Sequence, residues 1–211
     1  PYRALLYLEA TQPESTRKFR LYSVACCRRV WKWLDAEPIR EAVEVAERFA
    51  DGAASLADLR EARLRAEELK ESLHAYETIR HLVYGAAIMA AADSALEGAK
   101  RINDLILQAG GNTEASWKSQ AMQVVLIHDI FGNPFQPVTF DPGWLTEPVV
   151  SLAREIYQER DFDRLPALAD RLCEAGCTHV QVIEHLRQSG PHARGCWVVD
   201  LLLGHDCSPG C

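Results

Sequence analysis

The stretch STRKFRLYSVACCRRVWKWL, residues 15–34, decides the fold class of this chain. Apolar and aromatic side chains recur in it every three or four residues, at Phe19, Tyr22, Cys26, Val30 and Trp33. This spacing places them on one face of an α-helix, because a helix has about 3.6 residues per turn. The stretch therefore predicts a helix over residues 15–34 with one buried face.

The same spacing recurs along most of the chain, so the other elements are expected to be helical as well. Pro38 suits the first turn of a helix that Asp51-Gly52 ends. Ser55 can cap a long helical stretch that continues to about Ala99. Shorter helices are expected at residues 113–131, 146–157, 165–172, 178–186 and 196–203. The prediction is an all-α fold, an irregular array of about eight helices with a long antiparallel helical pair in the middle.

The length and composition allow either one domain or two. A chain of 211 residues with 48% hydrophobic content can bury a core as a single helical domain over 1–211 or as two packed halves. Gly110-Gly111-Asn112 is the best candidate boundary, because this cluster ends the preceding periodic segment. It predicts a subdivision into 1–110 and 113–205, with a frayed tail from Cys207 to Cys211.

The charge and hydropathy pattern narrows the classes of partner. The formal net charge is −7, from 30 acidic and 23 basic residues, which disfavours broad contact with nucleic acid or an anionic membrane. The longest uncharged apolar run, Leu82 to Ala92, is too short to span a bilayer. We therefore expect a protein partner, no membrane partner and no nucleic acid, while the sequence assigns no oligomeric state.

The cysteines indicate a reducing compartment. Seven of them occur at irregular spacing, which does not resemble a disulfide framework. Residues 1–10 lack the layout of a secretory signal, so a cytoplasmic location is expected. Because the chain begins with Pro1, it can also be a fragment of a longer protein.

Cysteine and histidine residues near the C-terminus are candidate metal ligands. Cys173, Cys177, His185 and Cys196 fall close together in sequence, and zinc favours thiolate and imidazole ligands. Their spacing matches no zinc-finger pattern, and free cysteines behave as small apolar residues in cores. We therefore expect no cofactor, with a structural zinc ion as the alternative.

A nucleophilic set is the candidate for catalysis. His192, Cys196 and Asp200 are four residues apart, so on one helix they would share a face, as a thiol, a base and an orienting carboxylate require. Asp129 is a further candidate for acid–base chemistry. The sequence lacks a P-loop, G-x-G-x-x-G, G-x-S-x-G and H-E-x-x-H, which removes the enzyme classes that these motifs define.

Four strings of the sequence resemble a family of uncharacterised proteins abundant in planctomycete bacteria. They are RLYSVACCRRVW, AVEVAERFADG, DIFGNPF and GPHARGCWVVD, at residues 20–31, 42–52, 129–135 and 190–200. The segment from about Arg60 to Ser116 matches only in being helical and rich in alanine. The resemblance implies a bacterial, cytosolic protein and brings no activity or catalytic residue with it. Among the residues in these strings, it makes Arg28, Asn133 and Arg194 candidates for ligand binding.

Together these features favour a non-catalytic, intracellular helical module for protein interaction or regulation. The alternative is an enzyme or a metal-dependent module. Its site would form where the 129–137 loop meets the 192–200 segment, which would bring Asp129, His192, Arg194 and Cys196 together.

Overall fold

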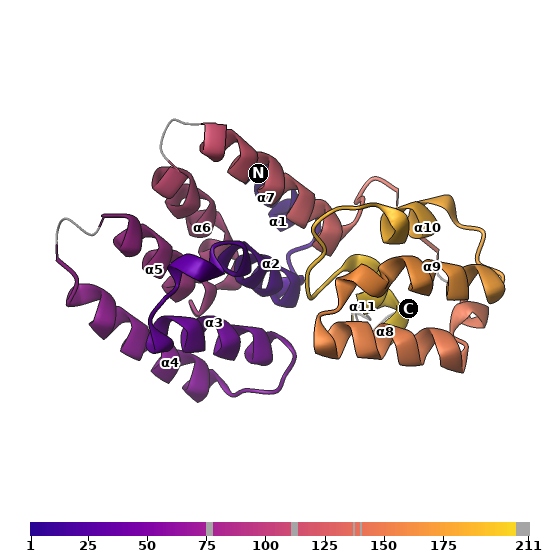
Figure 1. The fold of residues 1–211 in the computed structure, drawn as a ribbon, viewed down its shortest axis with the longest axis horizontal. Coiled ribbons are helices and arrows are strands. Elements are labelled where there is room, and N and C mark those ends of the chain that lie inside the picture. The colour runs from indigo at the N-terminus through magenta and orange to yellow at the C-terminus, as the bar shows by residue number, and fades with distance from the viewer. Residues whose placement is uncertain (75–77, 111–113, 137, 140, 206–211) are drawn as a thin grey trace. The chain divides into compact units, whose positions relative to one another are not determined.

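The computed structural model describes residues 1–74, 78–110, 114–136, 138–139 and 141–205 (Figure 1). All regular secondary structure in these residues is helical, which confirms the all-α class. None of the described helices has the length and apolarity needed to cross a membrane. The α-helices are α1 (Tyr2–Thr11), α2 (Thr16–Arg29), α3 (Glu37–Ala50), α4 (Leu56–Glu71), α5 (Thr78–Ala90), α6 (Ala95–Gly110), α7 (Glu114–Phe131), α8 (Glu147–Glu159), α9 (Leu165–Glu174), α10 (Val180–Arg187) and α11 (Trp197–Leu203), with 3-10 turns η1 (Trp31–Trp33), η2 (Pro142–Trp144) and η3 (Phe162–Arg164).

The predicted number of about eight helices is too low, because the described residues hold eleven α-helices. Helix α1 was not expected, and the long middle stretch divides into α4, α5 and α6. The break between α5 and α6 contains neither glycine nor proline. The sequence pattern therefore did not indicate that one helix ends and another begins there. Ser94 marks the new start, since its hydroxyl accepts a hydrogen bond from the Glu97 amide at 3.3 Å.

Contacts divide the chain into two compact units, residues 1–127 and 128–211, with the division inside α7. The boundary predicted at 110–113 falls mostly on residues 111–113, which lie outside the described residues, as do Cys207 to Cys211.

Unit 1 is built around α2, which packs against α3, α5 and α6, while α4 packs on α3 (Figure 1). Nine residues of α2 are buried, from Phe19 to Cys27, so the helix has a wider buried surface than its single apolar stripe predicted. Arg20 belongs to this surface and is only 4% exposed. Its guanidinium donates hydrogen bonds to the backbone oxygens of Ala90, Ala92 and Asp93. These carbonyl groups at the end of α5 thereby gain the donors that a helix end leaves missing.

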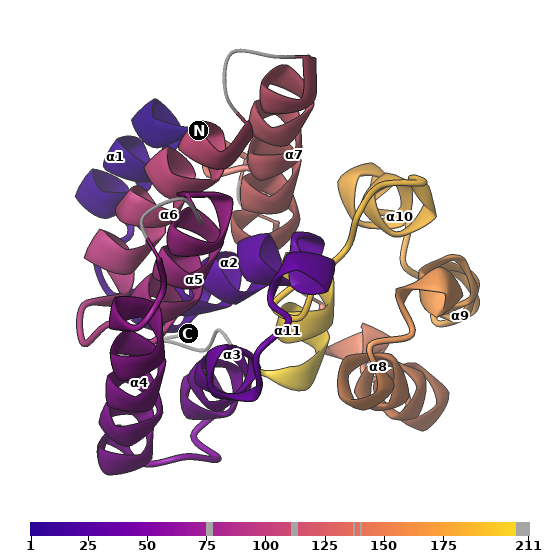
Figure 2. The same cartoon turned by 60° about the vertical axis from the view of Figure 1, so that its left-hand side comes forward.

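Unit 2 places α9 between α8 and α10, with α11 packed on α8 and α10; Figure 2 views α8, α9 and α10 end-on. One apolar core joins these helices. It contains side chains from all four, including Ile156, Leu168, Leu186 and Val199. The core fixes the positions of α10 and α11, from whose ends the polar centre described next is assembled.

Candidate metal centre

Four side chains with metal-ligating atoms converge inside unit 2. They are Asp129 in the last turn of α7, His185 in α10, His192 in the α10–α11 loop (residues 188–196) and Cys196 at the end of that loop. One ligand atom from each lies within 4.8 Å of all the others. We call these four residues the polar centre.

The distances within the polar centre are those of direct contacts. Oδ1 of Asp129 lies 2.6 Å from Nδ1 of His192 and 3.2 Å from Nε2 of His185. The same Nε2 of His185 lies 3.2 Å from Sγ of Cys196. Oδ2 of Asp129 accepts a hydrogen bond of 2.8 Å from the Ala193 amide. Asp129 is therefore the hub of the group.

Two glycines allow the backbone to bring these residues together. Gly132 ends α7 with φ +68°, and a Cβ atom there would lie 3.2 Å from the Trp197 indole. Glycine therefore lets the end of α7 approach the start of α11 closely. Gly195 has φ +95° in the turn where the Cys196 amide donates to the Ala193 oxygen at 3.0 Å. This turn directs Cys196 back toward α10.

The polar centre is buried, and burial shapes its acid–base behaviour. The side chains of Asp129, His192 and His185 are 2%, 5% and 9% exposed. Burial alone would raise the pKa of Asp129, but hydrogen bonds from His185 and His192 outweigh it, so the pKa is lowered. Burial would likewise lower the pKa of His192, yet its hydrogen bond to Asp129 and the charge there raise it. The Asp129–His192 pair therefore favours the charged forms.

Cys196 behaves differently from the other members. It is fully buried, and burial, reinforced by the negative charge of Asp129, raises the pKa of its thiol well above the usual value. A thiol that is protonated and shielded from solvent is a poor nucleophile. A bound cation reverses this preference, because a coordinating thiol loses its proton.

Gln188 contacts both histidines from outside the polar centre. Its backbone oxygen lies 3.3 Å from Nε2 of His192, and its side-chain amide lies 3.0 Å from Nδ1 of His185. These are the ring nitrogens that do not face Asp129. Metal-bound histidines usually donate their second ring nitrogen to such a carbonyl or amide oxygen, and an amide can be turned to present either atom. Gln188 therefore suits the role of orienting both rings.

The donor set fits zinc by its chemistry and by most of its distances. One thiolate, two imidazoles and one carboxylate are ligands that zinc accepts in a tetrahedron. With bonds of about 2.0–2.3 Å, the donors on one zinc ion are about 3.3–3.7 Å apart. The two 3.2 Å contacts of His185 come near that range, whereas the 2.6 Å contact between Asp129 and His192 is shorter.

The structure does not assemble the triad that the 192, 196 and 200 spacing predicted. Helix α11 begins at Trp197, so His192 lies outside it and the argument from a shared helix face does not hold. His192 contacts Asp129, Cys196 contacts His185, and Asp200, which is fully buried, contacts His205 at 3.2 Å.

The predicted zinc ligands divide into two groups. His185 and Cys196 belong to the polar centre. Cys173 is exposed on α9, and Cys177 follows α9 as part of the apolar core of unit 2. Neither is a member of the polar centre.

The residues predicted to bind a ligand make contacts within the protein, and their role in binding stays a prediction. Arg28 pairs with the buried Glu47 at 3.0 Å and lies 4.2 Å above the Trp31 ring. The side-chain oxygen of Asn133 accepts from the Phe135 amide at 3.0 Å, as in a turn. The Arg194 guanidinium lies 4.4 Å from the Tyr157 ring.

Sequence reasoning found His185 in part and missed Gln188. His185 was proposed as a zinc ligand together with Cys173, Cys177 and Cys196, but not with Asp129 or His192. Gln188 was not singled out at all, although it lies three residues after His185, at a helix end. Only that i, i+3 spacing could have indicated their contact.

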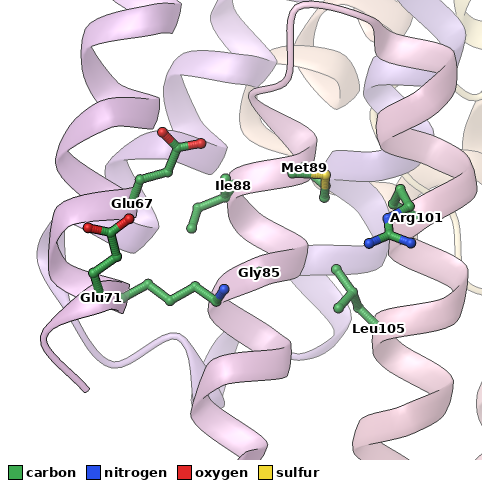
Figure 3. A pocket seen from close by; sticks show the side chains of 8 residues that line it. Glu67, Glu71, Gly85, Ile88, Met89, Arg101 and Leu105 are labelled. Atoms are coloured by element: carbon green, nitrogen blue, oxygen red, sulfur yellow. The ribbon is translucent and has the colours of Figure 1, made fainter. Parts of the chain in front are cut away.

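Unit 1 has a pocket of about 290 Å³ between α4, α5 and α6. Figure 3 shows Glu67 and Glu71 on one side of it, Arg101 and Leu105 on the other, and Met89 between them. Glu67 is paired with Arg63 at 2.8 Å. Charges of both signs line the pocket, so it does not favour one class of ligand.

The fold and the polar centre together define a class: a two-unit, all-α protein with a buried Asp/His/His/Cys group. The sequence matches no family model, no curated protein and no solved structure significantly. The planctomycete resemblance therefore stays a prediction, and the function has to be inferred from the polar centre itself.

Proposed function

We propose that unit 2 is a zinc-dependent, non-catalytic helical module. The observation that carries this proposal is the convergence of four different ligand atoms within 4.8 Å in a buried setting. Isolated buried ionisable groups are unfavourable, so a cluster of this composition needs a specific reason to exist. Coordination of a cation supplies that reason.

A structural role is favoured over a catalytic one. Four protein ligands complete the tetrahedron of a structural zinc site, whereas a catalytic site keeps a position for water or substrate. The Cys196 thiol is buried with a raised pKa, which argues against a nucleophilic role. Bound zinc would link the end of α7, α10 and the start of α11, much as a disulfide links distant segments.

The state of the other cysteines is compatible with a reducing, cytoplasmic location, which we retain as part of the proposal. The five cysteines in the described residues are all free thiols. A zinc–thiolate bond at Cys196 would persist where disulfides are not maintained. A protein as partner remains a prediction.

Elemental analysis and metal titration of the purified protein test the proposal. We expect about one zinc ion per chain, loss of thermal stability on chelation, and the visible absorption of a thiolate-ligated tetrahedral ion after Co²⁺ substitution. Free zinc at about 100 times its Kd stabilises a folded protein by about 2.7 kcal/mol.

Matched variants locate the site. Cys196→Ser and Asp129→Asn each remove one ligand and should weaken zinc binding by about 100-fold or more, with helical circular dichroism retained. Cys173→Ser in the same unit should leave binding unchanged. Protein that takes up no zinc at one equivalent, or variants that bind as tightly as the parent, would refute the proposal.

A further inference from the structure

Asp129 and His192 share a hydrogen bond that cannot persist when both atoms bind one metal ion. Nδ1 of His192 lies 2.6 Å from Oδ1 of Asp129. Two such donors on one tetrahedral zinc ion are about 3.3 Å apart. In addition, an imidazole nitrogen that binds a metal gives up its proton. The hydrogen bond and the coordination by these two atoms therefore exclude each other.

His192 is the member of the polar centre best placed to move. Asp129 and His185 lie within α7 and α10, and Cys196 is the N-cap of α11, where its oxygen accepts from the Asp200 amide at 2.9 Å. His192 lies on irregular backbone in the α10–α11 loop. Pro191 directly precedes it, and Gly195, with φ +95°, follows three residues later and permits backbone rotation that other residues resist.

A second hydrogen bond provides a pivot for that movement. Oδ2 of Asp129 accepts from the Ala193 amide at 2.8 Å. This hydrogen bond does not involve Oδ1. It can therefore remain while Oδ1 loses its hydrogen bond from Nδ1 of His192 and binds the metal ion instead. The loop therefore stays attached to α7 at Ala193 while the His192 ring separates from Oδ1.

We propose that zinc binding switches the α10–α11 loop between two arrangements, an inference that rests on the proposed function. In the first, Nδ1–H of His192 donates to Asp129. In the second, Nδ1 binds zinc and Nε2–H donates to the Gln188 oxygen. The Nδ1 proton of His192 and the thiol proton of Cys196 are released to solvent, while the proton on Nε2 of His185 is replaced by one on Nδ1, which donates to the side-chain oxygen of Gln188. In the first arrangement hydrogen bonds satisfy the buried Asp129 carboxylate without a metal ion. Zinc can therefore bind and leave, and the polar centre then acts as a reversible zinc sensor.

The loop can transmit this change to the apolar core of unit 2, to which Tyr157 belongs. Arg194 follows the pivot residue directly, and its guanidinium lies 4.4 Å from the Tyr157 ring in α8. The His205 ring contacts the same tyrosine, with ring centroids 4.9 Å apart. A shift at His192 is therefore expected to alter the surroundings of Tyr157, which does not belong to the polar centre.

Nuclear magnetic resonance of the full chain, labelled with ¹⁵N and titrated with Zn²⁺, tests the switch. Long-range ring spectra identify which nitrogen of His192 carries a proton, and backbone amides report on the loop. We expect loss of the Nδ1 proton, amide shifts concentrated in residues 188–196, and a change at the Tyr157 ring. Amides of α9, residues 165–174, serve as the internal reference.

A variant separates movement of the loop from mere proximity to zinc. His192→Ala leaves three ligands, so zinc should bind more weakly and still shift the Cys196 amide, while Ala193 and Arg194 no longer respond. If the parent binds one zinc ion but its loop amides shift no more than those of α9, the switch is refuted and the zinc site stands. If no zinc binds, both proposals fail.

Discussion

Both units bury ionised side chains, but the partners of those side chains differ in kind. In unit 1, Arg20 donates to three backbone oxygens at the end of α5. In unit 2, Asp129 is held by two histidine rings and one amide. Backbone oxygens fixed at a helix end offer no alternative chemistry, whereas imidazoles can exchange a proton for a metal ion. The partners of Asp129 would therefore permit metal binding, whereas those of Arg20 would not.

The cysteines show the same contrast. Cys26 and Cys27 lie in the α2 core, where burial raises the pKa of Cys26 to about 12 and raises that of Cys27 as well. The charge of Arg28 lowers the pKa of Cys27 but does not overcome the effect of burial, and its guanidinium pairs with Glu47. Cys196 is equally buried but lies 3.2 Å from an imidazole nitrogen. The neighbours, and not the residue type, make Cys196 the candidate ligand.

The largest expected effect is on thiol reactivity. Cys173 is exposed, so it should react readily with iodoacetamide, while Cys26 and Cys27 should react at least about 1,000-fold more slowly because reagent reaches them only after opening of the core. Mass spectrometry of peptides from timed labelling measures each rate. Rapid labelling of Cys26 or Cys27 in the folded protein would contradict the inert role assigned to them.

The next largest effect concerns the buried cation of unit 1. Arg20→Met should destabilise the protein by about 3 kcal/mol, because it leaves buried carbonyl groups at the end of α5 without donors. The same substitution should leave zinc affinity unchanged. Chemical denaturation followed by circular dichroism measures the free energy of unfolding, and metal titration measures the zinc affinity.

Arg60→Met is the matched control for that substitution. Arg60 also pairs with a residue at the same helix connection, at 2.8 Å from Asp93, but both side chains are about half exposed. Exposed ion pairs contribute little, so this variant should unfold almost as the parent does. If the two variants lost similar stability, the assignment of Arg20 as a buried structural cation would be wrong.

A smaller effect is expected from the residue that orients the histidines. Gln188→Ala should weaken zinc binding by about 10-fold, because the His185 ring loses a hydrogen-bond partner outside the polar centre. Gln188→Glu keeps an acceptor at that position and should bind more tightly than the alanine variant. Equal affinities for the parent and Gln188→Ala would remove Gln188 from the site.

The all-α class could be predicted because apolar periodicity reports directly on helices. Helix boundaries were harder, since the break before α6 depends on Ser94 and on the Arg20 contacts from a distant helix. Sequence reasoning proposed Asp129, His192 and Cys196 together as one alternative site, but it also grouped two of them with Asp200 in a triad. It could not show that α11 begins after Cys196, and that boundary decides which residues meet.

The contribution of His185 illustrates a general limit of spacing arguments. It lies 56 residues from Asp129 in sequence, and their 3.2 Å contact arises from the packing of α10 against its own unit's core. No local pattern encodes such a contact. Asp129, His192 and Cys196 were therefore within reach of the sequence as one site, whereas their grouping with His185 required the fold.

The smallest expected effect is the stability lost when the side chain before a helix is removed, compared between one helix of each unit. Ser55 caps α4 with a hydrogen bond of 3.1 Å from the Asp58 amide, as its position before the apolar stretch predicted. Ser55→Ala should therefore cost about 1 kcal/mol of stability. Thr146 occupies the same position before α8, but its side chain makes no capping hydrogen bond, so Thr146→Ala should cost clearly less. Thermal unfolding of both variants measures the difference, and equal losses would mean that the Ser55 cap does not stabilise α4.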